Sequence, residues 1–253
     1  MRHLRHQLID LLDQARSQHR MDRVPPRLMA ALVQDFLSLL PHGKSKPVAM
    51  HYRTLTHGNL HRHIFTIRCP DQAFYLDAIK GYMIRSGIQP IGQQTMVARM
   101  ECGADGCHLE LKRPKQHDSS ASDDGNFMFI ALHLSATTSP DPEMVRLDIQ
   151  AILQAVNLSV RDFDAMRKSV AQSIVRLMSQ SPDAAALLDW MNDNHYLYFG
   201  LIQQDKRLGV MKNKHALKRV APRLADDIAA TPAATEAGIE WLKLCGSQHY
   251  LYS

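Results

Sequence analysis

The chain has 253 residues, of which 45% are hydrophobic and 22% are charged, and its formal net charge is +5. This composition suits a folded protein with a packed core and argues against wholesale disorder. No apolar run reaches the roughly 18 residues that a membrane-spanning helix needs, and residues 1–20 lack the apolar stretch of a signal peptide, so we expect a cytoplasmic protein without membrane contact.

Two helices are expected at the N-terminus. Apolar residues between positions 3 and 19 recur at helical spacing. Pro25 and Pro26 suit the start of a second amphipathic helix, which ends before Pro41. Two helices joined by a short turn pack against each other, so we assign residues 1–43 to a helical hairpin.

Residues 44–136 have the pattern of β-strands. Two strands are predicted around a turn at residues 56–59, and another strand is expected after residue 88. A hairpin is predicted around Gly103–Gly106. Residues 126–136 form the most apolar run, which we expect at the centre of a sheet, whereas the polar residues 114–125 predict a loop.

One helix is expected among these strands, over residues 71–86. Asp71 follows a proline and can cap the helix start, and Gly87 can end the helix. The order of strands and helices over residues 44–157 predicts an α+β domain with an antiparallel sheet. It is the ferredoxin-like arrangement that ACT regulatory domains also have.

The rest of the chain is predicted to be mainly helical. Asp141–Glu143 suits a helix start, and Ser159 is placed to cap a second helix. A short third helix runs into an aromatic strand that begins at Tyr196, and a final helix is expected around residues 233–246. We assign residues 158–253 to a helical segment with this strand and a basic C-terminal tail.

Two segments resemble the large bacterial NAD-specific glutamate dehydrogenases. Residues 69–91 resemble the family's D-x-P-F-L-V-D-S segment with the helix and R-x-G-L that follow it, although Ala73 replaces the family's proline. Residues 187–205 resemble the family's F-L-x-W-L-x-D-x-H-F-x-F-L-G-Y-x-x-Y. The matching residues are Asp71, Phe74, Leu76, Asp77, Arg85 and Gly87 in the first segment, and Trp190, Asp193, His195, Tyr196, Phe199 and Gly200 in the second.

The resemblance covers about residues 1–205 and implies the N-terminal ACT-like region of that family. In the family this region precedes a catalytic domain that oxidises glutamate to 2-oxoglutarate with NAD. The chain has no G-x-G-x-x-G that opens a helix after a strand, so we expect no catalytic or nucleotide-binding domain and no cofactor in this chain.

The resemblance therefore implies a regulatory and assembly module without turnover of its own. Its partners would be another copy of itself or the catalytic segments of a dehydrogenase, and a small-molecule effector is a further option. The alternative is that the chain is a fragment or subunit of an active NAD-dependent glutamate dehydrogenase.

Asp71, Gln72 and Phe74 are the candidate ligand-binding residues, because ACT domains bind amino acids at this strand-to-helix turn. Backbone N–H groups at a helix start can receive a ligand carboxylate. In the alternative, structural interpretation Asp71 only caps the helix and Asp77 faces solvent. Two acids six positions apart do not face each other on a helix, so we predict no catalytic pair. Phe74 would fill the space that a ligand occupies in amino-acid-binding ACT domains, which have a glycine in this turn.

Histidines and cysteines gather around the two hairpins. The residues concerned are His51, His57, His61 and His63 at the first, and Cys102, Cys107 and His108 at the second. The C-x4-C spacing across a turn differs from the tighter cysteine pairs of zinc sites, so we predict no metal site. The four cysteines, at 69, 102, 107 and 245, are too few and too scattered for a disulfide framework, so we expect reduced thiols.

Trp190, His195, Tyr196 and Phe199 belong to the densest aromatic group in the chain. We expect them to pack in the core or at an interface rather than to line a cofactor pocket. His195 stands at the junction of a helix and a strand, where its ring can hydrogen-bond a helix end.

Residues 205–223 are strongly basic and supply a third hypothesis, a nucleic-acid-associated protein. Such binding would depend on Lys212, Lys214, Lys218 and Arg219. The stretch contains no interleaved aromatic residues and no nucleic-acid motif, so we favour a solvated surface over nucleic acid as a partner.

Overall fold

The computed structural model of the chain describes residues 5–10, 12, 26–40, 47–57, 60–88, 90–103, 106–112, 125–135, 140–203, 206–220, 225–226 and 242–248. The chain divides into two compact units, Met1–Arg146 and Leu147–Ser253. This division differs from the predicted boundaries after residues 43 and 157. No boundary follows residue 43 because the N-terminal helices contribute to the core of the first unit.

The first unit is built on a five-stranded antiparallel sheet with the order β1-β2-β5-β3-β4. The strands are β1 (Ala49–His57), β2 (Leu60–Pro70), β3 (Pro90–Gly103), β4 (Gly106–Lys112) and β5 (Asn126–Ser135). The predicted hairpins are confirmed, and the apolar run at 126–135 is the central strand as expected. Because β2 and β3 both pair antiparallel with β5, they run parallel to each other on either side of it.

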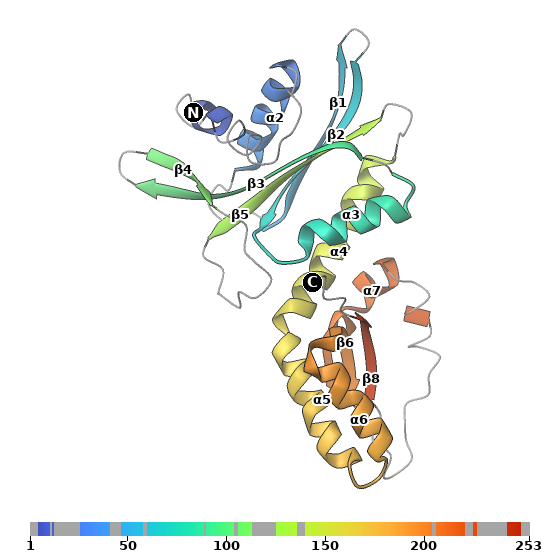
Figure 1. The fold of residues 1–253 in the computed structure, drawn as a ribbon. Coiled ribbons are helices and arrows are strands. Elements are labelled where there is room, and N and C mark those ends of the chain that lie inside the picture. The colour runs from blue at the N-terminus through green and yellow to red at the C-terminus, as the bar shows by residue number, and fades with distance from the viewer. Residues whose placement is uncertain are drawn as a thin grey trace. The chain divides into compact units, whose positions relative to one another are not determined.

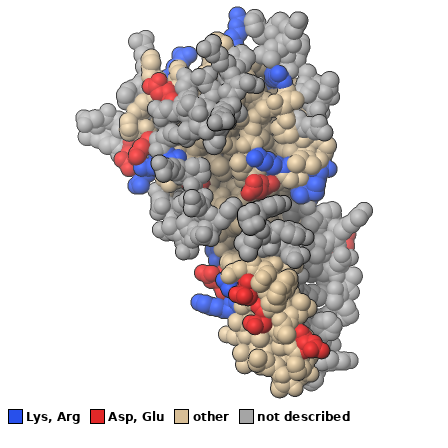
Figure 2. Space-filling view, in the orientation of Figure 1, with Lys and Arg blue, Asp and Glu red and all other residues tan. Residues whose placement is uncertain are grey.

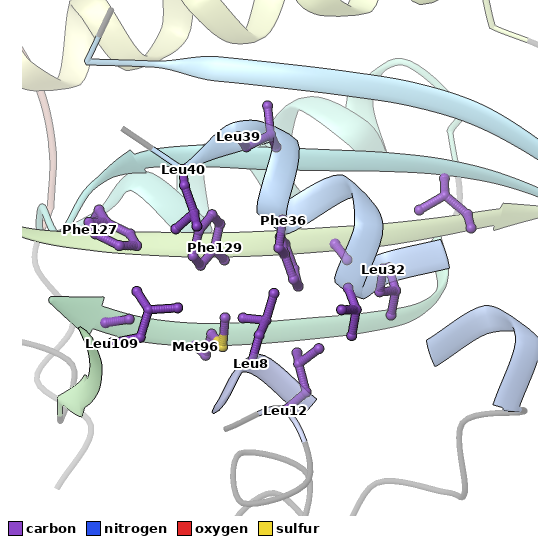
Figure 3. Packing of buried hydrophobic residues seen from close by; sticks show 14 of the residues in the cluster. Leu8, Leu12, Leu32, Phe36, Leu39, Leu40, Met96, Leu109, Phe127 and Phe129 are labelled. Carbon is purple, nitrogen blue, oxygen red and sulfur yellow. The ribbon is translucent and has the colours of Figure 1, made fainter. Parts of the chain in front are cut away.

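Helix α2 (Pro26–Leu39) covers one face of this sheet, and α3 (Tyr75–Arg85) lies on the other side (Figure 1). The rings of Phe36 in α2 and Phe129 in β5 lie 4.6 Å apart. Leu8 and Leu12 from the N-terminal helical segment join the same buried cluster (Figure 3). The two predicted N-terminal helices thus share one core, which is also the core under the sheet.

Helix α3 begins later than predicted. The N-cap position is held by Phe74 rather than by Asp71. The backbone N–H of Asp71 donates to the carbonyl of Asn126 at 3.2 Å and prolongs the pairing of β2 with β5. The residue before the helix is Phe74, which provides no side-chain cap. The helix end is as predicted: Gly87 has a φ of 68°, and the N–H of Ile88 reaches the carbonyl of Met83 at 2.9 Å.

The second unit combines helices with a small antiparallel sheet of order β7-β6-β8. The helices are α4 (Pro142–Arg161), whose first turn belongs to the first unit, α5 (Phe163–Leu177), α6 (Pro182–Trp190) and α7 (Lys214–Val220). The strands are β6 (Tyr196–Gln203), β7 (Lys206–Gly209) and β8 (Leu242–Gln248). Tyr198 and Leu201 of β6 pack on Met166 and Val170 of α5 in a buried cluster.

Two predictions for this unit are wrong. Ser159 does not cap a helix, because α4 continues to Arg161 and the break between α4 and α5 falls at Asp162. Residues 242–246 are not helical, because they pair with β6 as part of β8. The rest of that predicted helix, and the predicted loop except Gly125, lie outside the described residues.

Within the described ranges, none of the helices is long and apolar enough to span a lipid bilayer.

Candidate functional site

Asp71, Gln72 and Phe74, the candidate ligand-binding residues, lie in the turn between β2 and α3. The carbonyl of Gln72 accepts a hydrogen bond from the N–H of Tyr75 at 3.4 Å. Phe74 has a φ of 68°, a left-handed conformation that costs little for glycine and more for any residue with a Cβ. The turn therefore has a backbone conformation that glycine adopts more readily than phenylalanine.

Cys69 lies immediately before this turn and is fully buried. Its thiol points toward the carbonyl of Met128 at 3.9 Å. Burial, assisted by the negative charge of Asp71, raises the pKa of Cys69 to about 12. The group therefore remains a thiol at neutral pH and is a poor nucleophile.

Asp35 is a buried acid that the sequence analysis missed. It lies on the apolar face of α2 with a side-chain exposure of 0%. One carboxylate oxygen is paired with the guanidinium of Arg53 and lies 3.0 Å from Nδ1 of His51, and the other accepts a hydrogen bond from Thr66 at 3.3 Å. An acid at a helix position that is otherwise apolar is the signal that could have revealed this contact.

The two described histidines of the first hairpin lie on opposite faces of the sheet. His51 is beside Asp35 on the α2 face, whereas Nδ1 of His63 lies 2.7 Å from the hydroxyl of Tyr52 and 3.1 Å from that of Thr54. The side chains of His57 and His61 are outside the described residues. In the part of the chain that the structure describes, no group of three or more His, Cys, Asp or Glu side chains could hold a metal ion.

The aromatic group in the second unit surrounds the junction between α6 and β6. The segment Met191–His195 links the two elements through a kink, in which Asp193 and Asn194 have non-helical backbone angles and Asn194 has a φ of 60°. The ring of His195 stacks on Trp190 with centroids 4.6 Å apart, and its Nδ1 lies 3.0 Å from the carbonyl of Trp190. The hydrogen bond to a helix end that the sequence suggested is therefore present.

The remaining aromatic residues of the junction divide between core and surface. Tyr196 and Tyr198 pack together with ring centroids 5.4 Å apart, and burial raises the pKa of Tyr198 to about 12. An irregularity in the pairing of β6 with β8 falls between Tyr198 and Gly200, at Phe199. Phe199 is 37% exposed and Trp190 is 45% exposed, so these two rings are available for contact with another molecule.

Asp162, at the elbow between α4 and α5, is a second buried acid that the sequence analysis missed. Its carboxylate accepts hydrogen bonds from the backbone N–H of Gly209 at 2.9 Å and from Lys212 at 2.6 Å, and Arg161 lies 3.3 Å away. Burial alone would raise the pKa of Asp162, but these donors outweigh it and lower the pKa. The carboxylate thus ties the helical elbow to the end of β7.

The basic stretch at 205–223 is partly neutralised by neighbouring acids. Lys212 pairs with Asp162, and Arg219 pairs with Asp148 of α4. Lys214 and Lys218 are exposed. On the face that Figure 2 shows, the described Lys and Arg side chains are scattered among acidic ones rather than gathered in one patch.

Comparison with known proteins identifies no relative: no family profile, no curated protein and no solved structure matches this chain.

Proposed function

We propose that this chain is a regulatory and assembly module related to the N-terminal ACT-like region of large bacterial NAD-specific glutamate dehydrogenases. The observation that carries the proposal is the path of the chain from β2 through α3 to β3, with β5 between these two parallel strands. Two parallel strands joined by a helix, with an antiparallel strand between them in the sheet, form the split β-α-β unit of ferredoxin-like domains.

The proposed domain is a variant of that fold. A ferredoxin-like domain continues from its second helix into a fourth strand. In this chain β1, which precedes β2, lies at the edge beside β2, and β4 extends the opposite edge. On this proposal, the sheet keeps the split unit and fills its edges with strands taken from different points of the sequence.

Several residues that match the dehydrogenase segments lie at positions where the backbone conformation or the packing restricts which residue fits, which supports the resemblance. Gly87 takes a left-handed conformation at the end of α3. A Cβ on Gly200 would lie 2.8 Å from Cγ of Met211, so no larger residue fits there without movement. Trp190 and His195 are stacked. Matches at such positions have more weight than matches at exposed, freely variable ones.

We propose that the exposed ring of Trp190 contributes to the assembly surface, with a second copy of the chain as the partner. Partly exposed tryptophan and other large aromatic side chains are the residues that most often dominate the energy of protein interfaces. In analytical ultracentrifugation, the chain is expected to self-associate as its concentration rises. Trp190→Ala should weaken that association at least about tenfold, which corresponds to about 1.4 kcal/mol.

Val175→Ala is the matched control, because Val175 is apolar and 71% exposed but lies outside the aromatic group. This variant should associate like the unchanged chain. A chain that stays monomeric at all concentrations, or that responds equally to both substitutions, would contradict the proposed assembly.

A second assay separates the module from its alternatives. The purified chain with glutamate and NAD should form no NADH, whereas NADH formation would favour an active dehydrogenase. Salt-dependent DNA binding that is lost on Lys214→Ala and Lys218→Ala would instead favour the nucleic-acid hypothesis.

A further inference from the structure

The β3–β4 hairpin sets two cysteines opposite each other in the sheet. Its register pairs Met100 with Leu109, Glu101 with His108, Cys102 with Cys107 and Gly103 with Gly106. Opposed residues in an antiparallel ladder alternate between hydrogen-bonded and non-hydrogen-bonded pairs, and the side chains of the second kind lie closer together.

A contact from the N-terminal helical segment identifies the kind of pair. The N–H of Leu109 donates to Oε1 of Gln7 at 3.2 Å, so it points away from β3 and Met100–Leu109 is a non-hydrogen-bonded pair. The alternation makes Glu101–His108 hydrogen-bonded and Cys102–Cys107 non-hydrogen-bonded.

This pair type has the backbone spacing that a disulfide requires. Cα atoms of a non-hydrogen-bonded pair are about 4.5 Å apart, and disulfides span Cα separations of about 4.4–6.8 Å. The sequence spacing C-x4-C, which is a poor match to zinc sites, therefore suits a bond across the end of the hairpin.

We propose that Cys102 and Cys107 form a reversible cross-strand disulfide, which makes the β3–β4 hairpin an oxidation-sensitive element with hydrogen peroxide as the oxidant. The thiolate of one cysteine attacks the peroxide O–O bond and becomes a sulfenic acid, and the departing hydroxide takes up a proton to give water. The second thiol attacks the sulfenic sulfur, the S–S bond forms, and a second water leaves. Two thiols lose two electrons and two protons, and one peroxide becomes two waters.

The same contact connects the hairpin to the helical core. Gln7 hydrogen-bonds the ring of His108 and the N–H of Leu109, one and two residues beyond Cys107. Leu8, the neighbour of Gln7, is fully buried in the cluster under the sheet. A bond that fixes the hairpin end therefore acts next to the attachment of the N-terminal segment. An effect of oxidation on the attachment of the N-terminal segment would be regulatory only if the proposed function holds, whereas the disulfide itself does not depend on that function.

Mass spectrometry of the full chain tests the bond. The chain is treated with peroxide, its thiols are blocked with N-ethylmaleimide, and it is then digested with trypsin. Both cysteines lie in the peptide Met100–Lys112, which contains no other cysteine. We expect this peptide to be unlabelled and lighter by two hydrogens after peroxide, and to carry two labels after dithiothreitol.

Two variants and an internal control sharpen the test. Cys102→Ser and Cys107→Ser should each abolish the two-hydrogen loss. Cys69, which is fully buried and lies in a different peptide, should take up the label after denaturation in both treated and untreated samples. The proposal is overturned if Met100–Lys112 keeps both labels after peroxide, if the bond joins two chains instead, or if added zinc alone protects the two thiols.

The consequence has a separate readout. Hydrogen exchange over residues 5–12 should be slower in the oxidised chain than in the reduced one, and equal exchange would overturn the coupling. A chain that forms the disulfide but never self-associates would retain this site and contradict only the proposed assembly.

Discussion

His133 is an ionisable side chain in the centre of the sheet. It is 5% exposed, it stands opposite Ile64 and Gly92, and its Nε2 is buried without a hydrogen-bond partner. Burial, with a smaller effect from the charge of Arg62, lowers the pKa of His133 from 6.5 to about 4. The folded chain therefore holds this histidine neutral, whereas the unfolded chain protonates it near pH 6.5.

This difference predicts a loss of stability in mild acid. Between pH 6.5 and pH 4 the unfolded state binds a proton at His133 that the folded state does not, so the free energy of unfolding falls as the pH falls. The expected loss from this residue is about 2 kcal/mol between pH 6.5 and 5. Urea unfolding of the chain and of His133→Leu at both pH values measures it, and the variant should lose less stability.

Ile67→Val provides the control, because Ile67 is fully buried in the same sheet and does not ionise. This variant should be less stable by about 1 kcal/mol at both pH values. A pH dependence in His133→Leu as steep as that of the unchanged chain would show that other groups cause the acid sensitivity.

At the scale of elements, the pairing of β6 with β7 depends on two opposed glycines, Gly200 and Gly209. Gly209 has a φ of 59°, and a Cβ on it would lie 2.2 Å from the carbonyl oxygen of Phe199. The backbone N–H of Gly209 also donates a hydrogen bond to the carboxylate of Asp162. The corner after β7 therefore needs both a backbone conformation and a close approach that only glycine allows.

Gly209→Ala is expected to destabilise the second unit by about 3 kcal/mol or more, because strain and a backbone clash combine. Gly81→Ala is the matched control, since Gly81 lies inside α3 and its added Cβ would meet only the end of Arg85, at 3.4 Å. This control should stabilise the chain by about 0.5–1 kcal/mol. Thermal unfolding followed by circular dichroism compares the two, and equal effects would contradict the close-approach argument.

Local patterns in the sequence were sufficient to predict most elements of the first unit. Strand alternation and turn residues identified the hairpins, and the apolar run at 126–135 identified the central strand. Gly87 marked the end of α3 correctly. The start of α3 was wrong because Asp71 continues the pairing with β5, a contact between residues distant in the sequence.

The candidate sites were harder to predict for the same reason. Asp35 contacts His51 and Arg53, which are distant from it in the sequence. Asp162 likewise contacts Gly209 and Lys212. Local periodicity does not predict such contacts. Residues 242–246 have helical spacing but pair with β6, so tertiary contact overrides local preference. The opposition of Cys102 and Cys107, in contrast, follows directly from the predicted hairpin.

At the scale of the whole molecule, the division into Met1–Arg146 and Leu147–Ser253 predicts unfolding in more than one step. Each unit has a hydrophobic cluster of its own. Differential scanning calorimetry should therefore resolve two transitions, and substitutions in one unit should move only one of them.

Asp35→Asn and Gly209→Ala assign the transitions. The first substitution removes a charge that Arg53 and His51 contact in the first unit, at an expected cost of about 2 kcal/mol, and should lower one transition by about 5 °C or more. The second should lower the other transition. A single transition that both substitutions shift equally would mean that the two units unfold as one.

The side chain of Gln7 has a consequence for solubility. Among the described strands, β4 is an edge strand of its sheet. The outward backbone N–H and C=O groups of an edge strand can pair with an extended segment of another chain. The side-chain oxygen of Gln7 accepts a hydrogen bond from the outward N–H of Leu109. This N–H is therefore no longer available to a strand of another chain. The side chain of Gln7 therefore blocks one position of this edge for pairing with a strand of another copy, a contact that can start edge-to-edge aggregation.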